Sequence, residues 1–89
     1  MEDFDLFYLR DKEKREVDFL VSREGKPWFM VEVKESDTAL SPALRHFQNL
    51  ARCPHAFQAV MREDYVDRDC FTEEGPIVVP ARTLLSQLL

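Results

Sequence analysis

Glycine is one of the rarest residues in this sequence, and its scarcity excludes one large class of sites. Only Gly25 and Gly75 occur among the 89 residues. A G-x-x-x-x-G-K-[ST] loop, which cradles nucleotide phosphates, needs two glycines five positions apart and a lysine directly after the second. Because the two glycines here lie far apart, the sequence holds no loop of this kind, and we expect no ATP site in it.

Cysteine is equally rare, and long apolar runs are missing. Cys53 and Cys70 lack the close, even spacing of a disulfide framework, so we expect two reduced and buried thiols. His46 and His55 do not combine with Cys53 in a spacing typical of zinc ligands, so we expect one on a helix surface and one in a loop. No apolar run approaches the roughly 20 residues of a membrane span, and no basic, then apolar leader opens the sequence. We therefore expect a cytoplasmic protein without membrane contact.

The overall balance of charge is acidic but uneven. Charged residues make up 33% and hydrophobic residues 45% of the sequence, which is typical of a folded domain, and we expect one domain over residues 1–89. A net charge of −5 argues against strong non-specific binding to nucleic acid, because phosphate affinity depends mostly on lysine and arginine. However, six acids lie between residues 63 and 74 and four bases between residues 10 and 15, which leaves a local basic edge open.

Alternation of apolar and polar residues predicts a sheet, and one helical period interrupts it. We expect strands at residues 6–10, 16–22 and 28–35, with a turn around Gly25 before the third. From Ser41, the expected N-cap, apolar residues recur at helical spacing until Pro54 ends the pattern. Residues 56–62 and 76–80 predict two more strands, and residues 81–89 a terminal helix. The order βββαββα predicts an α/β fold with a mixed sheet of the α+β kind.

Charged residues interrupt the second and third predicted strands. Alternation should place them on one face of each strand and the valines and phenylalanines on the other. The apolar set is Val17, Phe19, Val21, Phe29, Val31 and Val33. The opposite set is Glu16, Asp18, Leu20, Met30, Glu32 and Lys34. If these strands pair as a hairpin, two carboxylates and a lysine converge on one face.

Two interpretations of the charged set are open at this point. The first is a solvated face of an antiparallel sheet, where a cross-strand pair such as Asp18 with Lys34 is common, although Leu20 and Met30 do not suit such a face. The second is a site for a hard cation, because carboxylate and carbonyl oxygens together with water suit Mg²⁺. A lysine beside the cation could orient a water molecule or stabilise charge on a phosphate, so this site would hydrolyse phosphodiesters.

The spacing of Asp18 and the segment Glu32-Val33-Lys34 resembles the D…(D/E)-x-K signature of the PD-(D/E)XK nuclease superfamily. The stretches FYLRDKEKREVDFLV, VEVKES and GPIVVP together resemble a C-terminal nuclease-like domain of unknown function carried by many bacterial and archaeal AAA-type ATPases. This resemblance covers most of residues 7–88. It implies a restriction-endonuclease-like core, from which this chain departs because it lacks the usual first helix. We expect either a truncated or C-terminal fragment of a longer ATPase-type protein or a free-standing remnant that covers its exposed sheet by self-association.

The resemblance also implies roles for individual residues. Asp18 and Glu32 would ligate Mg²⁺ or Mn²⁺ with the carbonyl of Val33, Lys34 would be the catalytic lysine, and Glu16 would be an accessory residue. The implied activity is magnesium-dependent cleavage of DNA, and the alternative is a catalytically inactive interaction or regulatory domain of an AAA-type ATPase. The expected partners are DNA, a second copy of the chain, or an upstream ATPase domain that covers the exposed sheet.

Gln48 lies in the region where some of these nucleases carry a helical glutamine. The residues that follow it do not complete the Q-x-x-x-Y pattern, so we expect Gln48 to be a surface residue. Trp28 is expected to pack at the end of a strand.

Overall fold

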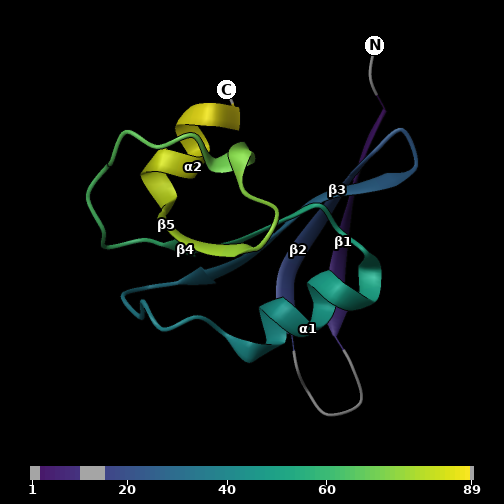
Figure 1. The fold of residues 1–89 in the computed structure, drawn as a ribbon, viewed down its shortest axis with the longest axis horizontal. Helices are drawn as coiled ribbons and strands as arrows, with labels where there is room; N and C mark the ends of the chain where they lie inside the picture. Colours follow the sequence, from purple (N-terminus) through teal and green to yellow (C-terminus); the bar gives the residue numbers. More distant parts are fainter. Residues whose placement is uncertain (1–2, 11–15, 89) are drawn as a thin grey trace.

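The computed structural model describes residues 3–10 and 16–88, and the structural statements below refer to these residues. The chain follows the predicted order βββαββα, with a short 3-10 helix before the last strand (Figure 1). The strands are β1 (Phe4–Arg10), β2 (Glu16–Arg23), β3 (Lys26–Lys34), β4 (His55–Val60) and β5 (Pro76–Pro80). The helices are α1 (Pro42–Ala51), the 3-10 helix η1 (Cys70–Thr72) and α2 (Ala81–Leu88). The predicted elements are therefore confirmed, close to their expected ends.

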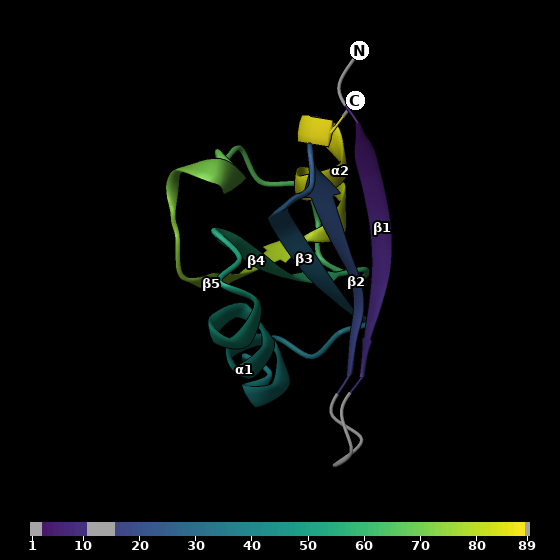
Figure 2. The same cartoon turned by 90° about the vertical axis from the view of Figure 1, so that its right-hand side faces the viewer.

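The five strands form one mixed sheet in the order β1-β2-β3-β4-β5. The first three strands are antiparallel neighbours, while β3, β4 and β5 run parallel to one another. The predicted fold, α/β with a mixed sheet, is therefore confirmed. Figure 2 shows α1 and α2 far apart from each other, with β1 as an outer strand of the sheet.

Local sequence signals explain the turn and the first helix. Glu24 and Gly25 both have positive φ, 53° and 80°, as a tight hairpin turn requires, and glycine adopts this conformation without steric cost. Pro42 stands in the first turn of α1, where its missing N–H needs no partner. Helix α1 is capped by Arg52, whose left-handed conformation turns the chain back on the helix end. The N–H of Arg52 donates to the carbonyl of Asn49 at 3.3 Å, and the N–H of Cys53 donates to that of Gln48 at 3.1 Å.

Each face of the sheet has its own hydrophobic core. On one face, α1 packs against β2, β3 and β4, and the buried residues are Val17, Leu20, Met30, Leu44, Phe47, Cys53 and Ala56. On the other face, α2 covers β4 and β5, and the buried residues are Phe29, Val31, Phe57, Ala59, Cys70, Ile77, Val79, Ala81 and Leu84. Because α2 lies over the last strands, β1 and part of β2 are not covered by it.

A β-bulge in β2 overturns one prediction about side-chain faces. Phe7 pairs with Leu20 and Leu9 pairs with Val17, so two residues of β2, Asp18 and Phe19, lie opposite the single residue Tyr8. An extra residue reverses the alternation beyond it. Val17 therefore joins the α1 core instead of sharing a face with Phe19, and the prediction that they lie together was wrong.

The two cysteines are buried, and the two histidines lie in a helix and in a strand. Cys53 and Cys70 are both free and buried, as predicted. His46 lies half-buried on α1. His55 is the first residue of β4, not part of a loop, and its ring packs edge-on against Phe71 with the centroids 5.1 Å apart. Among the described residues, no helix has the length and apolarity needed to cross a membrane.

Candidate functional site

The predicted site residues lie where strands β2 and β3 separate. The last described pair between these strands joins Phe19 to Val31, whereas β3 continues to pair with β4 as far as Lys34 and Val60. Residues Glu32 to Lys34 thus keep a neighbour on one side only among the described strands. We call Asp18, Glu32, Val33 and Lys34 the fork site.

The side chain of Asp18 bridges the gap between the two strands. Its Oδ2 accepts a hydrogen bond of 2.5 Å from the backbone N–H of Val33. That N–H lies beyond the last β2–β3 pair, so the carboxylate takes the place of a backbone carbonyl of β2. The bulge supplies the reason, since an extra residue re-aims the side chains beside it. Asp18 is thereby attached to the middle residue of the Glu32-Val33-Lys34 segment.

Glu32 and Lys34 form an ion pair along the same strand. The Nζ of Lys34 lies 3.3 Å from Oε1 of Glu32, and the side chains are 35% and 12% exposed, respectively. The other oxygen of this carboxylate, Oε2, is buried and has no hydrogen-bond partner. A buried acceptor without a partner is unfavourable, so the Glu32 carboxylate has an unused capacity to bind a cation or a donor.

Val33 presents different chemistry on the other face of β3. Its side chain is 41% exposed and lines an apolar groove of about 160 Å³ together with Phe19 of β2 and Leu84 of α2. Because side chains alternate along β3, Glu32 and Lys34 point to the opposite face. The fork site therefore has a charged side and an apolar side, separated by the backbone of β3.

A buried glutamine holds the loop that follows the fork. Gln58 lies beside Glu32 in the parallel ladder and is completely buried. Its Nε2 donates to the carbonyls of Asp37 and Ala39 at 3.1 and 2.8 Å, and its Oε1 accepts from the backbone N–H of Ser41 at 2.8 Å. These contacts fix the segment between Lys34 and α1. Directly after the end of β3, Glu35 forms an exposed ion pair with Arg62.

The structure brings the predicted residues together in two pairs. Asp18 accepts a hydrogen bond from the backbone N–H of Val33, and Lys34 forms an ion pair with Glu32. The cross-strand ion pair considered for Asp18 and Lys34 is replaced by the pair within β3. Glu16, the predicted accessory residue, begins β2 and pairs with Arg10 in the ladder. The side chain of Glu16 lies outside the described residues, so its predicted role stays a prediction.

The donor atoms at the fork are of the kind that hard cations prefer. Asp18 uses Oδ2 for the amide of Val33, and Glu32 has a buried oxygen without a partner. Carboxylate oxygens with a backbone carbonyl and water fit Mg²⁺ or Mn²⁺. In the part of the chain that the structure describes, no group of three or more His, Cys, Asp or Glu residues is placed to hold a metal. A cation at the fork would therefore depend on two carboxylates, completed by backbone and water oxygens.

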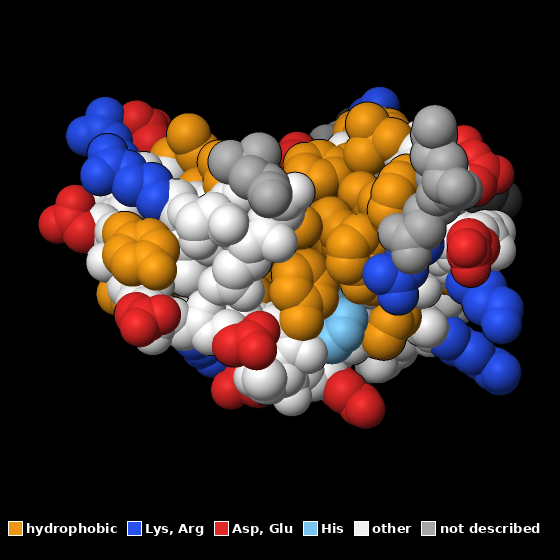
Figure 3. Space-filling view, turned by 90° about the horizontal axis from the view of Figure 1, so that it is seen from above, with side chains coloured by type: hydrophobic (Ala, Val, Ile, Leu, Met, Phe, Trp, Pro, Cys, Tyr) orange, Lys and Arg blue, Asp and Glu red, His pale blue; other side chains and the backbone are white. Residues whose placement is uncertain are grey.

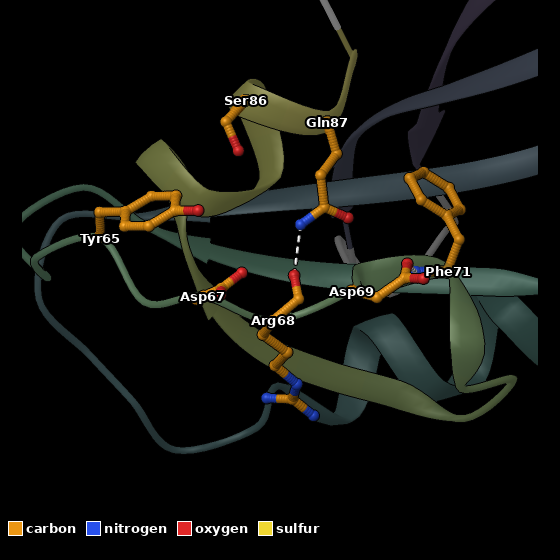
Figure 4. Close-up of a pocket in the computed structure, with 7 residues that line it drawn as sticks. All are labelled: Tyr65, Asp67, Arg68, Asp69, Phe71, Ser86 and Gln87. Atoms are coloured by element: carbon orange, nitrogen blue, oxygen red, sulfur yellow. Dashed lines mark hydrogen bonds between the residues drawn. The ribbon is translucent and has the colours of Figure 1, made fainter.

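A larger cavity, of about 640 Å³, lies elsewhere, between α2 and the loop before η1 (Figure 4). Most of its polar groups already have structural partners. The amide of Gln87 donates to the carbonyl of Arg68 and accepts from the N–H of Cys70. Asp69 accepts from the N–H of Phe71, and Arg68 pairs with Glu73 at 2.8 Å. We interpret these contacts as supports for η1.

Sequence reasoning missed two polar residues that organise the region. Gln48 is buried rather than on the surface, because its Nε2 donates to the carbonyls of Cys53 and Glu74, so the prediction was wrong. Gln58 carried no signal in the alternating stretch HAFQAV, where it occupied a position compatible with a solvated face. Each glutamine donates to a loop carbonyl that is distant in sequence, Gln48 to that of Glu74 and Gln58 to that of Asp37, which no local pattern indicates.

The comparisons with known proteins give a family and no function. A family model described as "Domain of unknown function (DUF4143)" matches residues 1–84. Searches of curated proteins and of solved structures found no match.

Proposed function

Starting from the membership of this chain in the DUF4143 family, whose function is unknown, we propose that it hydrolyses DNA phosphodiester bonds with Mg²⁺ or Mn²⁺ at the fork site. One observation carries the proposal. The buried Oε2 of Glu32 lacks a partner in a segment to which the Asp18 carboxylate is also bound. Two carboxylates are thus held at one end of β3, and the one with a buried oxygen that lacks a partner, Glu32, lies next to a lysine.

Three residues would hold the cation. Asp18 and Glu32 offer carboxylate oxygens, and Val33 offers its backbone carbonyl. A bound Mg²⁺ would polarise the phosphate and lower the pKa of a coordinated water molecule. The hydrogen bond from Val33 orients the Asp18 carboxylate, and the ion pair with Lys34 orients that of Glu32. Such orientation in advance lowers the reorganisation that catalysis would otherwise require.

Lys34 has the position of an electrostatic group in this proposal. Its ammonium forms an ion pair with Glu32. Because the Lys34 side chain is 35% exposed, the ammonium can reach a phosphate that approaches from solvent. In hydrolysis a water oxygen attacks phosphorus and the bond from phosphorus to the leaving sugar oxygen breaks. A fixed ammonium stabilises the negative charge that develops on the phosphate oxygens in this step.

The resemblance of the Asp18, Glu32 and Lys34 spacing to the PD-(D/E)XK signature agrees with this assignment. The same resemblance associates the domain with AAA-type ATPases, so we include an upstream ATPase domain among the proposed partners. DNA would reach the charged side of the fork, because the opposite side of β3 carries the apolar groove at Val33.

Cleavage of linear, supercoiled and branched DNA with Mg²⁺ or Mn²⁺ tests the proposal. We expect Asp18→Asn, Glu32→Gln and Lys34→Ala each to reduce cleavage by about 100-fold or more. Two exposed residues away from the fork supply matched controls, Asp64→Asn for the acids and Lys26→Ala for the lysine, and both should retain full activity. Absence of cleavage by the unmodified chain, or equal cleavage by fork variants and controls, would refute it.

The second candidate function is a catalytically inactive interaction or regulatory domain of an AAA-type ATPase. The observation that favours it is the set of exposed hydrophobic side chains around the apolar groove, Val33, Met61, Leu85 and Leu88. Calorimetric titration with Mn²⁺ and DNA distinguishes the two functions. Binding of both, lost in Asp18→Asn, supports the nuclease, whereas a folded chain that binds neither supports the interaction domain.

A further inference from the structure

Strand β1 is an edge strand that is hydrophobic on both faces. Phe4, Leu6, Phe7 and Tyr8 are 49%, 69%, 50% and 58% exposed. Because successive side chains alternate, Leu6 and Phe7 lie on opposite faces of the sheet. Edge strands are usually protected by lysine, proline or inward charges. The middle of β1 has none of these, which is the pattern of a strand with a neighbour on each side. Figure 3 shows a group of hydrophobic side chains near the middle of one face of the molecule.

The backbone of β1 directs alternate residues toward the free edge. The carbonyl of Asp3 accepts a bond of 2.7 Å from the N–H of Glu24, so the peptide groups of Asp3 face β2. By alternation those of Asp5 and Phe7 also face β2, and the N–H and carbonyl of Leu6 face away from it. The outer edge of β1 therefore offers a donor and an acceptor at Leu6 to another strand.

Charges of opposite sign lie near the two ends of β1. Among the described residues, two acids, Asp3 and Asp5, lie near the start of β1. A base, Arg10, ends the strand. Two copies aligned antiparallel would bring the acidic end of one strand beside Arg10 of the other, whereas a parallel alignment would juxtapose like charges. We propose that β1 pairs antiparallel with β1 of a second copy, which continues the sheet across a twofold axis.

The geometry also sets the register of this pairing. Pairing all seven residues of β1 with a second β1 places Phe7 opposite Phe7 of the second copy, and Leu6 opposite Tyr8. Apolar side chains then meet on both faces, and cross-strand contacts of this kind stabilise sheets. Because the peptide groups of Phe7 face β2, the Phe7 pair is a non-hydrogen-bonded pair, with its Cα atoms about 4.5 Å apart.

Sedimentation equilibrium of the full chain at several concentrations tests the pairing. Leu6 and Leu50 are both 69% exposed, so Leu6→Lys and Leu50→Lys are matched substitutions in β1 and α1. We expect a dimer for the unmodified chain, at least a tenfold weaker dimer for Leu6→Lys, and no change for Leu50→Lys. Circular dichroism would verify that both variants are folded. A monomer at all concentrations, or equal effects of both substitutions, would overturn the proposal.

Cysteine cross-linking tests the register independently. Phe7→Cys should form a disulfide between two copies under mild oxidation, because its Cα separation lies within the range of disulfides. Phe4→Cys is the control, since Phe4 is 49% and Phe7 50% exposed. In the proposed register two copies of residue 4 are about 20 Å apart, six residues along the strand, and should not cross-link. Equal cross-linking of both variants, or none by Phe7→Cys, would contradict the pairing.

Discussion

The carboxylate of Asp18 accepts a hydrogen bond of 2.5 Å from the backbone N–H of Val33, and this bond joins β2 to β3 where their ladder has ended. It couples the fold to the candidate site, because the residue that closes the fork is also a proposed ligand. A bulge of two residues opposite Tyr8 makes the contact available. The strand irregularity and the site are therefore one structural feature.

Removing this carboxylate should destabilise the protein slightly. Asp18→Ala leaves the N–H of Val33 without its partner, and we expect the free energy of unfolding to fall by about 1 kcal/mol. Asp18→Asn keeps an acceptor oxygen and should lose less. Urea denaturation measures both, with Asp64→Ala as the control, since the Asp64 side chain is 98% exposed and pairs with the exposed Arg82 at 3.6 Å. Equal stability of the two alanine variants would show that the bond contributes nothing.

Binding of a divalent cation should raise stability through Glu32 and Asp18. A ligand that binds only the folded state at 100 times its dissociation constant adds about 2.7 kcal/mol. We expect Mn²⁺ to raise the midpoint of thermal unfolding of the unmodified chain, and Glu32→Gln to remove this increase.

Glu35→Gln is the matched control for this experiment, because Glu35 is close in sequence but lies 71% exposed in an ion pair with Arg62. It should keep the increase. A cation effect of the same size in Glu32→Gln would place the binding elsewhere on this acidic chain.

Loss of the Gln58 amide should loosen the loop after the fork. Gln58→Leu has a similar size but leaves the N–H of Ser41 and the carbonyls of Asp37 and Ala39 without these partners. We expect a loss of about 2 kcal/mol in stability and faster hydrogen exchange over residues 37–41. Gln87→Leu removes comparable backbone contacts beside η1 and should leave exchange in residues 37–41 unchanged.

The periodicity of the sequence was sufficient to predict the order of elements. Period-two alternation marks the strands, and Pro42, Pro54 and Gly25 mark ends and turns because their backbones have special requirements. The bulge at Asp18 and Phe19 was not predictable, since neither residue type is specific to bulges. It reversed the face of Val17, so the predicted meeting of charged rows became a bond from Asp18 to the backbone of β3.

The candidate site was predicted as a set of residues, not as a geometry. Spacing and resemblance selected Asp18, Glu32 and Lys34, but neither indicated that β2 and β3 separate at this point. The separation depends on β3 continuing along β4, which is a contact between segments distant in sequence. The buried amide of Gln58 depends on the same long-range pairing, which explains why a pattern of neighbouring residues did not reveal it.

Both buried thiols should make stability depend on pH in the alkaline range. Burial raises the pKa of Cys53 and of Cys70 above the ordinary value of 9.0. The unfolded chain therefore loses these protons first, so the folded state binds more protons above pH 9.0 and its stability falls as pH rises through the folded-state pKa values. Below the unfolded pKa the thiols should contribute no pH dependence. Urea denaturation between pH 7 and pH 10.5 measures this, and Cys70→Ala should show a shallower alkaline loss than the unmodified chain. Since every other side chain is the same in both proteins, the difference between their curves isolates the Cys70 thiol, and parallel curves would contradict the predicted direction.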